Sequence, residues 1–194
     1  KFNEQFAGTF GIAGTFSFFP AKTLGCFGDG GAIITNCDEL SNNVKILRDH
    51  GRDSSTGKVT KYGFNARLDN IQAAILNVKF KYYKKDILRR REIAKIYHEK
   101  LSNLDKIKLP PGPNEGKLNY DIYQNYEIEA ENRDELILYL KNFGIGTIVQ
   151  WGGFALHQFN DLGFNSDLEF TESMTKKFMM LPIYPILTDE KILY

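Results

Sequence analysis

A lysine placed between a proline and a run of glycines is the residue of this 194-residue sequence best suited to covalent chemistry. Pro20 fixes its own φ two residues before Lys22, and glycines at positions 25, 28, 30 and 31 permit turns that other residues rarely adopt. A lysine amine has an ordinary pKa of about 10.4, so burial or a nearby cation must lower that pKa before the amine attacks an aldehyde. The segment predicts a lysine presented from a loop into a pocket; the alternative is a surface lysine beside a turn.

The residues around this lysine follow a recognisable order: Ser17, Phe18, Phe19, Pro20, Ala21, Lys22, then Gly28-Asp29-Gly30-Gly31. This order resembles the lysine signature of the DegT/DnrJ/EryC1/StrS family of pyridoxal-phosphate (PLP) sugar aminotransferases. The resemblance continues, in the expected order, through three more segments: His50–Arg52, Tyr62–Leu76 and Leu181–Glu190. It therefore covers essentially the whole chain.

The resemblance implies an α/β fold, that of the fold type I PLP-dependent transferases (aspartate aminotransferase-like). Residues 1–109 would be the C-terminal part of the PLP-binding large domain with a long connecting helix, and residues 110–194 a small α+β domain. The inner boundary is placed at the breaker Pro110–Pro113. Measured against the family, about the N-terminal half and a last helix are absent, so we interpret the chain as a fragment of a longer protein.

The family pattern assigns roles to Lys22 and Ser17. Lys22 matches the Schiff-base lysine, which also moves a proton between the amino-bearing carbon and the aldehyde carbon of the cofactor. Ser17 matches a ligand of the cofactor phosphate, since a hydroxyl can donate a hydrogen bond to an anion. The alternative for Ser17 is a serine that caps the local backbone.

Asn65 and Arg67 open the helical part of the third segment. In the family, this asparagine reaches the phosphate of the neighbouring subunit's cofactor, which implies a homodimer with shared active sites. Arg67 could add charge to the same anion or to the phosphates of a sugar nucleotide. The alternatives are a helix-entry turn residue for Asn65 and a salt bridge within the dimer for Arg67.

His157 lies where the family places residues near the sugar pocket, although the match around Trp151 is loose. A lone histidine is more often a structural hydrogen-bonding residue. The three histidines are scattered and the two cysteines lie eleven residues apart, so we expect no metal site.

Taken together, the resemblance implies an aminotransferase that moves an amino group, from glutamate, to a keto-sugar carried on a nucleotide, in the biosynthesis of amino sugars or surface polysaccharides. The aspartate and the stacking aromatic of such a site would lie upstream of this chain. One alternative is a catalytically silent fragment or remnant. A sugar dehydratase is disfavoured because such relatives carry histidine in place of the lysine, and a regulatory protein of the same fold has no positive support in the residues.

Composition excludes several other classes. The formal net charge is +1 and 42% of the residues are hydrophobic, so there is no electrostatic reason to expect nucleic acid or an acidic membrane as a partner. No apolar run approaches the ~20 residues that span a bilayer. Two cysteines do not make a disulfide framework and fit the reducing cytoplasm.

The pattern of apolar residues predicts the remaining elements. We expect a buried strand over residues 31–36, helices over 38–49, 133–143 and 169–180, and strands over 120–129 and from 147 to 150. One long helix, or two nearly continuous ones, should begin near a capping box formed by Asp69 and Gln72. Its apolar face comprises Leu68, Ile71, Ile75, Val78 and Tyr82. The run Arg89–Arg91 is predicted to lie on a solvated face.

Overall fold

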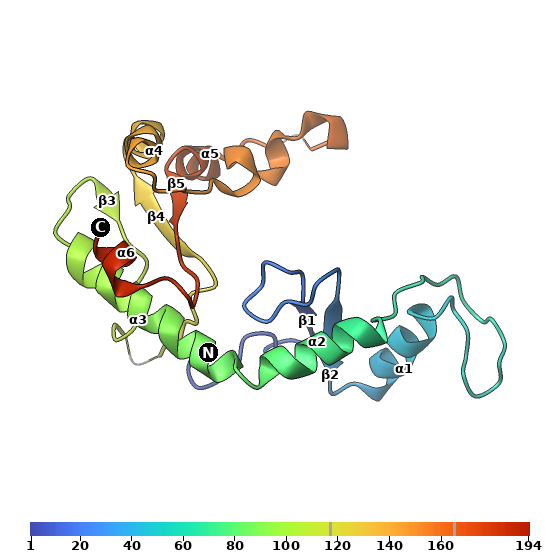
Figure 1. Ribbon diagram of the computed structural model, residues 1–194. Helices are drawn as coiled ribbons and strands as arrows, with labels where there is room; N and C mark the ends of the chain where they lie inside the picture. The colour runs from blue at the N-terminus through green and yellow to red at the C-terminus, as the bar shows by residue number, and fades with distance from the viewer. Residues whose placement is uncertain (117, 165) are drawn as a thin grey trace. The chain divides into compact units, whose positions relative to one another are not determined.

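The computed structural model describes residues 1–116, 118–164 and 166–194. The chain divides into two compact units, each considered by itself (Figure 1). Unit 1 comprises residues 1–86 and 118–120, and unit 2 comprises residues 87–116 and 121–194. The domain boundary predicted at residues 109–110 stays a prediction. Across the described ranges, no helix has the length and apolar character needed to cross a membrane.

Unit 1 contains a two-stranded antiparallel sheet, β1 (Ala13–Ser17) and β2 (Gly31–Thr35), followed by helix α1 (Asp38–Leu47). The register pairs Ala13 with Thr35 and Ser17 with Gly31. The predicted strand therefore forms, but the expectation that it is buried was wrong, because Ile33 and Ile34 are 49% and 41% exposed. No residue of β2 is buried, so neither face of this two-stranded sheet is covered by a packed core.

Two helices follow, α2 (Asn70–Phe80) and α3 (Tyr83–Leu101). This confirms the prediction of two nearly continuous helices rather than one long helix. The predicted apolar face was wrong: Ile71 and Val78 are exposed, and the buried residue of α2 is Leu76. Asp69 is the N-cap, but its side chain makes no capping hydrogen bond. The capping box does not form because the Gln72 carbonyl is engaged elsewhere, by the backbone N–H of a distant loop.

Unit 2 is built on a three-stranded antiparallel sheet of order β3-β4-β5, with β3 at Ile107–Lys108, β4 at Tyr126–Ala130 and β5 at Phe178–Leu181. Its helices include most of α3, then α4 (Arg133–Asn142), α5 (Glu169–Thr175) and α6 (Asp189–Leu193). Three short 3-10 helices connect α4 to α5, namely η1 (Gln150–Gly153), η2 (Leu156–Gln158) and η3 (Asn160–Leu162).

The core of unit 2 lies where α3 and α4 pack against this sheet (Figure 1). Alternate residues of β4 point inward, so that Tyr126, Ile128 and Ala130 are at most 2% exposed. Met179 of β5 is fully buried beside them. The period of two in burial is what the alternating sequence of β4 predicts.

Three predicted elements of unit 2 differ from the structure. The strand predicted over residues 120–129 forms only from Tyr126, as β4. The helix predicted over residues 169–180 ends at Thr175, and Phe178–Leu181 is a strand instead. These apolar residues are held by pairing with β4, a long-range interaction that local periodicity cannot reveal. The strand predicted from 147 to 150 is reduced to one isolated bridge between Ile148 and Met180.

The Arg89–Arg91 run does not form a solvated face. Arg90 is only 8% exposed and its Nη1 donates to three backbone carbonyls, those of Tyr123, Gln124 and Ile183, each at 3.1 Å. Arg89 donates from Nη2 to Asp189 Oδ1 at 2.6 Å. The guanidinium groups therefore join α3 to the segments that flank the sheet of unit 2.

Candidate active site

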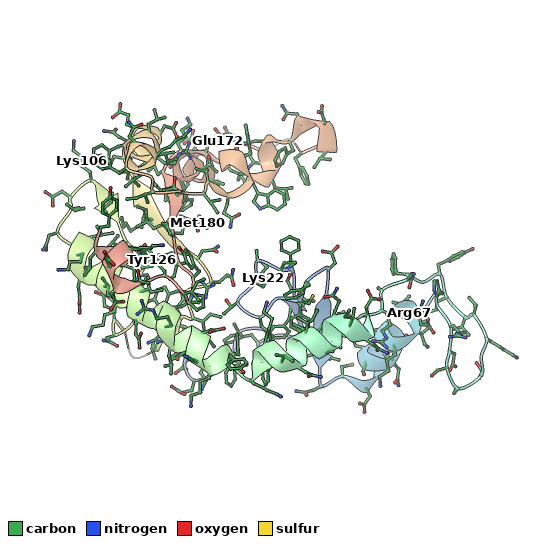
Figure 2. All side chains as sticks on the ribbon, in the orientation of Figure 1. Lys22, Arg67, Lys106, Tyr126, Glu172 and Met180 are labelled. Atoms are coloured by element: carbon green, nitrogen blue, oxygen red, sulfur yellow. The ribbon has the colours of Figure 1, made fainter. Side chains whose placement is uncertain are left out.

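Lys22 lies in a turn of the loop between β1 and β2 (Figure 2). Its backbone N–H donates to the Phe19 carbonyl at 2.8 Å. The two arms of the loop are joined by hydrogen bonds from Phe18 N to Gly30 O and from Cys26 N to Phe18 O, both 2.8 Å. The Lys22 side chain is exposed, and among the described residues none forms a hydrogen bond or ion pair with its amine. The loop thus fixes the backbone and leaves the amine exposed beside a turn, which is the alternative arrangement; the pocket into which Lys22 would point stays a prediction.

The glycines of this loop let its backbone lie close to neighbouring atoms; they are not needed for unusual backbone angles. None of those at 25, 28, 30 and 31 has a positive φ, so the expected unusual backbone angles were wrong. A Cβ on Gly25 would lie 2.5 Å from the Phe19 carbonyl oxygen, and one on Gly30 would lie 2.9 Å from Cys26 Sγ. Glycine is needed here because any side chain would collide with the other arm of the loop.

Ser17 ends β1 at the start of the same loop. Its Oγ accepts a hydrogen bond from the Phe19 N–H at 3.3 Å, which is the local backbone contact that the alternative interpretation expects. The hydroxyl proton remains able to donate to an anion, since a hydroxyl both accepts and donates. The phosphate role of Ser17 therefore stays a prediction.

Asn65 and Arg67 are brought together with the residues just after α1. Arg67 Nη1 lies 3.1 Å from Asp49 Oδ1, and Arg67 Nη2 donates to Asn65 Oδ1 at 3.1 Å. Arg52 Nη2 lies 2.9 Å from the other oxygen of Asp49. The hydrogen bond from Arg52, with the charges of Arg52 and Arg67, holds the pKa of Asp49 below its usual value. Asp49 was not among the predicted site residues, although it directly precedes the His50–Arg52 segment, which was the available signal.

This cluster limits what Arg67 can do. Its charge is already shared with Asp49 inside one chain, so the ion pair that the structure shows is intramolecular. The Asn65 carbonyl oxygen is occupied as an acceptor, and its NH₂ group keeps two donors for another ligand. The roles of Asn65 at a phosphate and of Arg67 at an anion stay predictions.

His157 belongs to unit 2, whereas Ser17, Lys22, Asn65 and Arg67 belong to unit 1. Its ring is 9% exposed in η2, and Nε2 lies 3.3 Å from Glu172 Oε1 of α5. The contact is of the structural kind expected for a lone histidine, and its substrate role stays a prediction.

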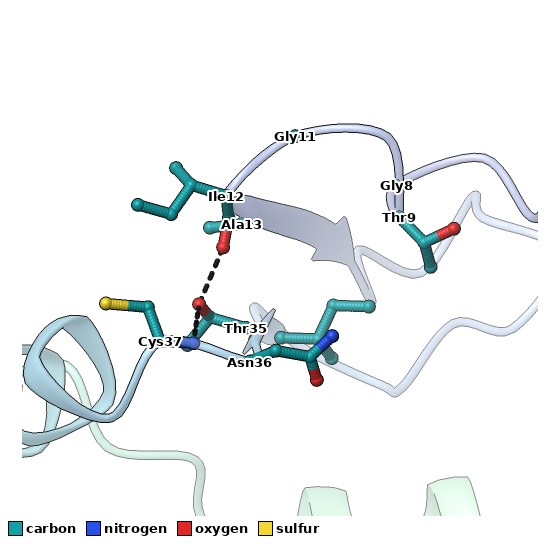
Figure 3. Close-up of a pocket in the computed structure, with 9 residues that line it drawn as sticks. Gly8, Thr9, Gly11, Ile12, Ala13, Thr35, Asn36 and Cys37 are labelled. Carbon is teal, nitrogen blue, oxygen red and sulfur yellow. Dashed lines mark hydrogen bonds between the residues drawn. The ribbon is translucent and has the colours of Figure 1, made fainter.

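Two hollows lie apart from the predicted residues. Figure 3 shows a shallow pocket of about 380 Å³ between β1, β2 and the start of α1, where the Thr35 hydroxyl donates to Ile12 O at 2.6 Å and accepts from Cys37 N at 3.0 Å. A larger apolar pocket of about 640 Å³ lies in unit 2 between α3, α4 and α6. None of the described residues lining either pocket is a predicted site residue. The candidate site is therefore defined by the Lys22 loop.

Comparison with known proteins identifies the class to which this loop belongs. The model of the DegT/DnrJ/EryC1/StrS aminotransferase family matches residues 1–194. The chain belongs to this family. It is 38% identical to a "pleiotropic regulatory protein" of Geobacillus stearothermophilus, covering 100% of this chain and 52% of that relative. It is 32% identical to the UDP-2-acetamido-2-deoxy-3-oxo-D-glucuronate aminotransferase of Pseudomonas aeruginosa, covering 91% of this chain and 48% of that relative.

Solved structures agree on the fold. A DegT DnrJ EryC1 StrS aminotransferase from Brucella abortus matches with a TM-score of 0.89 and 34% identity, over 99% of this chain and 51% of that one. DesV of S. venezuelae, solved in complex with a ketimine intermediate, matches with a TM-score of 0.89 and 29% identity, over 100% of this chain and 52% of that one. The predicted fold class, α/β of the fold type I PLP-dependent transferases, is confirmed. The chain spans about half the length of the relatives it matches.

The residues of unit 1 have the donor chemistry that the family's cofactor requires. PLP carries an aldehyde and a phosphate; the loop carries the exposed amine of Lys22, and Ser17 at its start carries a hydroxyl. The NH₂ group of Asn65 has the chemistry of a phosphate donor. Within the described ranges, no group of three or more histidine, cysteine or acidic residues could hold a metal ion, and Cys26 and Cys37 are free thiols. The residues present thus fit PLP better than a metal.

Proposed function

We propose that the protein to which this chain belongs is a PLP-dependent aminotransferase, which moves an amino group from glutamate to a keto-sugar carried on a nucleotide. Its product would be an amino sugar for a surface polysaccharide or a glycosylated metabolite. The carrying observation is an unengaged lysine amine on a closed loop, in a chain that belongs to a sugar-aminotransferase family. The relatives that are named as sugar aminotransferases, among them the enzyme from Pseudomonas aeruginosa, support the substrate class.

In this proposal, each predicted site residue has a role. The Lys22 amine would hold PLP by condensing with its aldehyde, with release of water, and the freed amine would then carry the proton that moves during amino transfer. PLP supplies the electron-accepting ring that makes this proton labile. Ser17 would donate a hydrogen bond from its hydroxyl to the phosphate, and the NH₂ group of Asn65 would donate one from a second copy of the chain. Arg67 would give up its ion pair with Asp49 and bind the phosphates of the substrate instead. His157 would contribute to the sugar pocket.

The proposal includes a homodimer in the cytoplasm. The dimer follows from Asn65 acting on the partner's cofactor, and the cytoplasmic location is supported by the two free thiols.

A second candidate is a protein that keeps the fold but has no turnover. The observation that favours it is the 38% identity to the "pleiotropic regulatory protein" of Geobacillus stearothermophilus. In that case, the present chain would be a catalytically silent part of such a protein. A dehydratase remains disfavoured, because Lys22 occupies the position where those relatives carry histidine.

Borohydride trapping tests the first candidate. The purified chain is incubated with PLP, reduced, digested and analysed by mass spectrometry. We expect a pyridoxyl group on the peptide carrying Lys22 and its loss in Lys22→Ala. The matched control is Lys81→Ala, an exposed lysine outside the loop, which should leave the adduct intact. Sparse adducts spread over many lysines would contradict a formed site in this chain.

A further inference from the structure

The Lys22 loop is attached to helix α2 by two side chains that come from far along the sequence. Gln72 Oε1 accepts a hydrogen bond from the Phe27 backbone N–H at 2.8 Å. Lys79 Nζ donates to the Gly25 carbonyl oxygen at 2.5 Å and lies 5.6 Å from the centre of the Phe27 ring. These contacts join residues 45 and 54 positions apart, so they fix the loop to the helix rather than only to itself.

The two side chains share one face of α2. Positions 72, 76 and 79 are spaced four and three residues apart, which places them one above another on a helix. Leu76, between the two polar residues, is the buried residue of α2. This face points to the loop, whereas Ile71 and Val78 on the predicted apolar face are exposed.

The loop is shaped to receive these contacts. A Cβ on Gly28 would lie 2.9 Å from Gln72 Nε2, so glycine at this position lets the amide approach the backbone. The Cys26 thiol is fully buried and lies 2.9 Å from Phe18 O and 3.0 Å from Gly28 O. Phe27, by contrast, is 76% exposed, so apolar burial of this ring does not hold the segment. The two polar side chains of α2 therefore provide the attachment.

We propose that Gln72 and Lys79 are positioning residues for Lys22. They act on the backbone at residues 25 and 27, and through the closed loop they set where the Lys22 amine is presented. This inference rests on the proposed function, in which that amine must meet an aldehyde carbon. A displacement of the reacting atoms by about 1 Å can reduce a rate about 100-fold. The Lys22 amine should therefore react much more slowly when the loop is released from α2.

The first readout does not depend on PLP. Cys26 is buried inside the loop, and Cys37 outside it serves as the internal reference. Alkylation of the full chain under native conditions is followed by peptide mass spectrometry. In Gln72→Ala and in Lys79→Met, we expect the Cys26 rate to rise at least about tenfold relative to Cys37. The matched controls are Asn77→Ala and Lys81→Met, exposed positions near the loop-facing residues for which no contact to the loop is found among the described residues.

The second readout is the rate of pyridoxyl trapping at Lys22. Both variants should slow trapping by about 10- to 100-fold, and the two controls should not. Lys79→Arg keeps a donor for the Gly25 carbonyl and Gln72→Glu keeps an acceptor for the Phe27 N–H, so both should restore most of the rate. A merely destabilised chain would not show this selective rescue.

The two readouts separate the two claims. Unchanged protection of Cys26 in Gln72→Ala and Lys79→Met overturns the attachment of the loop, whatever trapping gives. Exposure of Cys26 in these variants, with no trapping on the wild-type chain, supports the attachment and contradicts the proposed function. Exposure of Cys26 with unchanged trapping overturns the positioning role.

Discussion

Each of the two units of this chain is stabilised internally by a different kind of interaction. Among the described residues, the buried hydrophobic side chains of unit 1 are Cys26 and Leu76, whereas unit 2 has a continuous core around Tyr126, Ile128 and Met179. Unit 1 depends instead on hydrogen bonds to backbone groups and on glycines that allow close approach. The predicted reactive residue therefore lies in the unit with little apolar packing of its own.

This contrast between the units suggests that the stability of the chain and the geometry of its reactive lysine depend on different interactions. A buried core supplies most of the free energy of folding, about 25 cal/mol per Å² of apolar surface removed from water. Polar contacts to a loop contribute less each, but they are directional and so define where a side chain lies. Unit 2 is thus expected to dominate the free energy of unfolding, while unit 1 determines the geometry at Lys22.

The largest expected effect comes from the core. Met179→Ala should lower the free energy of unfolding by about 2–5 kcal/mol, because it leaves a cavity at a fully buried position. Ile71→Ala in unit 1, at a residue 68% exposed, should change that free energy by less than about 0.5 kcal/mol. Urea denaturation followed by circular dichroism measures both. Equal losses would show that the contrast between the units does not hold.

The buried guanidinium of unit 2 gives the next effect. Arg90→Met removes the donor for three carbonyls and should cost about 1–3 kcal/mol in free energy of unfolding. Arg91→Met is the matched control, since Arg91 is less buried and donates to two carbonyls, of Asp121 and Pro113. The same denaturation experiment should show the smaller loss for Arg91→Met, and the reverse order would contradict the role given to Arg90.

Alkaline pH should weaken unit 2. Burial raises the pKa of Tyr97 to about 12 and that of Tyr123 to about 12, from about 10 in the unfolded chain. The unfolded state therefore loses these protons first, so their contribution to stability is complete below pH 10 and is lost between about pH 10 and 12. The slope is at most about 1.4 kcal/mol per pH unit for each tyrosine.

Denaturation midpoints measured from pH 9 to 11.5 test this dependence. Tyr97→Phe removes one titrating group and should give a shallower decline with pH, even though it also loses the hydrogen bond to the Pro182 carbonyl. A decline equally steep in the variant would indicate that other groups cause it.

The smallest effect is expected at the exposed cluster of unit 1. Asp49→Asn should reduce stability only slightly near neutral pH, because exposed ion pairs contribute little. The pKa of Asp49 is lowered in the folded chain, so its contribution is present above its unfolded pKa and is lost as the pH falls through the folded value. Comparison of the two chains at pH 7 and pH 3 measures this, and a difference that grows at pH 3 would contradict it.

The sequence predicts well what short-range rules control. Helix α4 begins at Arg133 as expected. The loop around Lys22 was also located correctly from Pro20, which fixes the local backbone, and from the glycines, although these serve close approach and not the unusual backbone angles that were expected. The family was identified from the same local motifs and is confirmed.

What the sequence did not reveal depends on contacts between distant segments. Gln72 has the spacing of a capping residue, but its amide accepts from a loop 45 residues away. Arg90 has a charge that favours solvent, but three carbonyls offset the cost of its burial. The face of α2 was misassigned for the same reason, since its loop-facing side carries polar groups that hydrophobic periodicity does not count.

The bridge between Ile148 and Met180 has a consequence for aggregation. Strand β5 reads FMML, uncharged and apolar, and β4 covers only one of its edges. An apolar strand with an open edge is a template on which another chain can add. On the other edge, Ile148 N donates to Met180 O at 3.3 Å and Met180 N donates to Ile148 O at 2.8 Å. The backbone groups of Met180 on this edge are thus already paired with Ile148, which leaves less of the edge open to another chain.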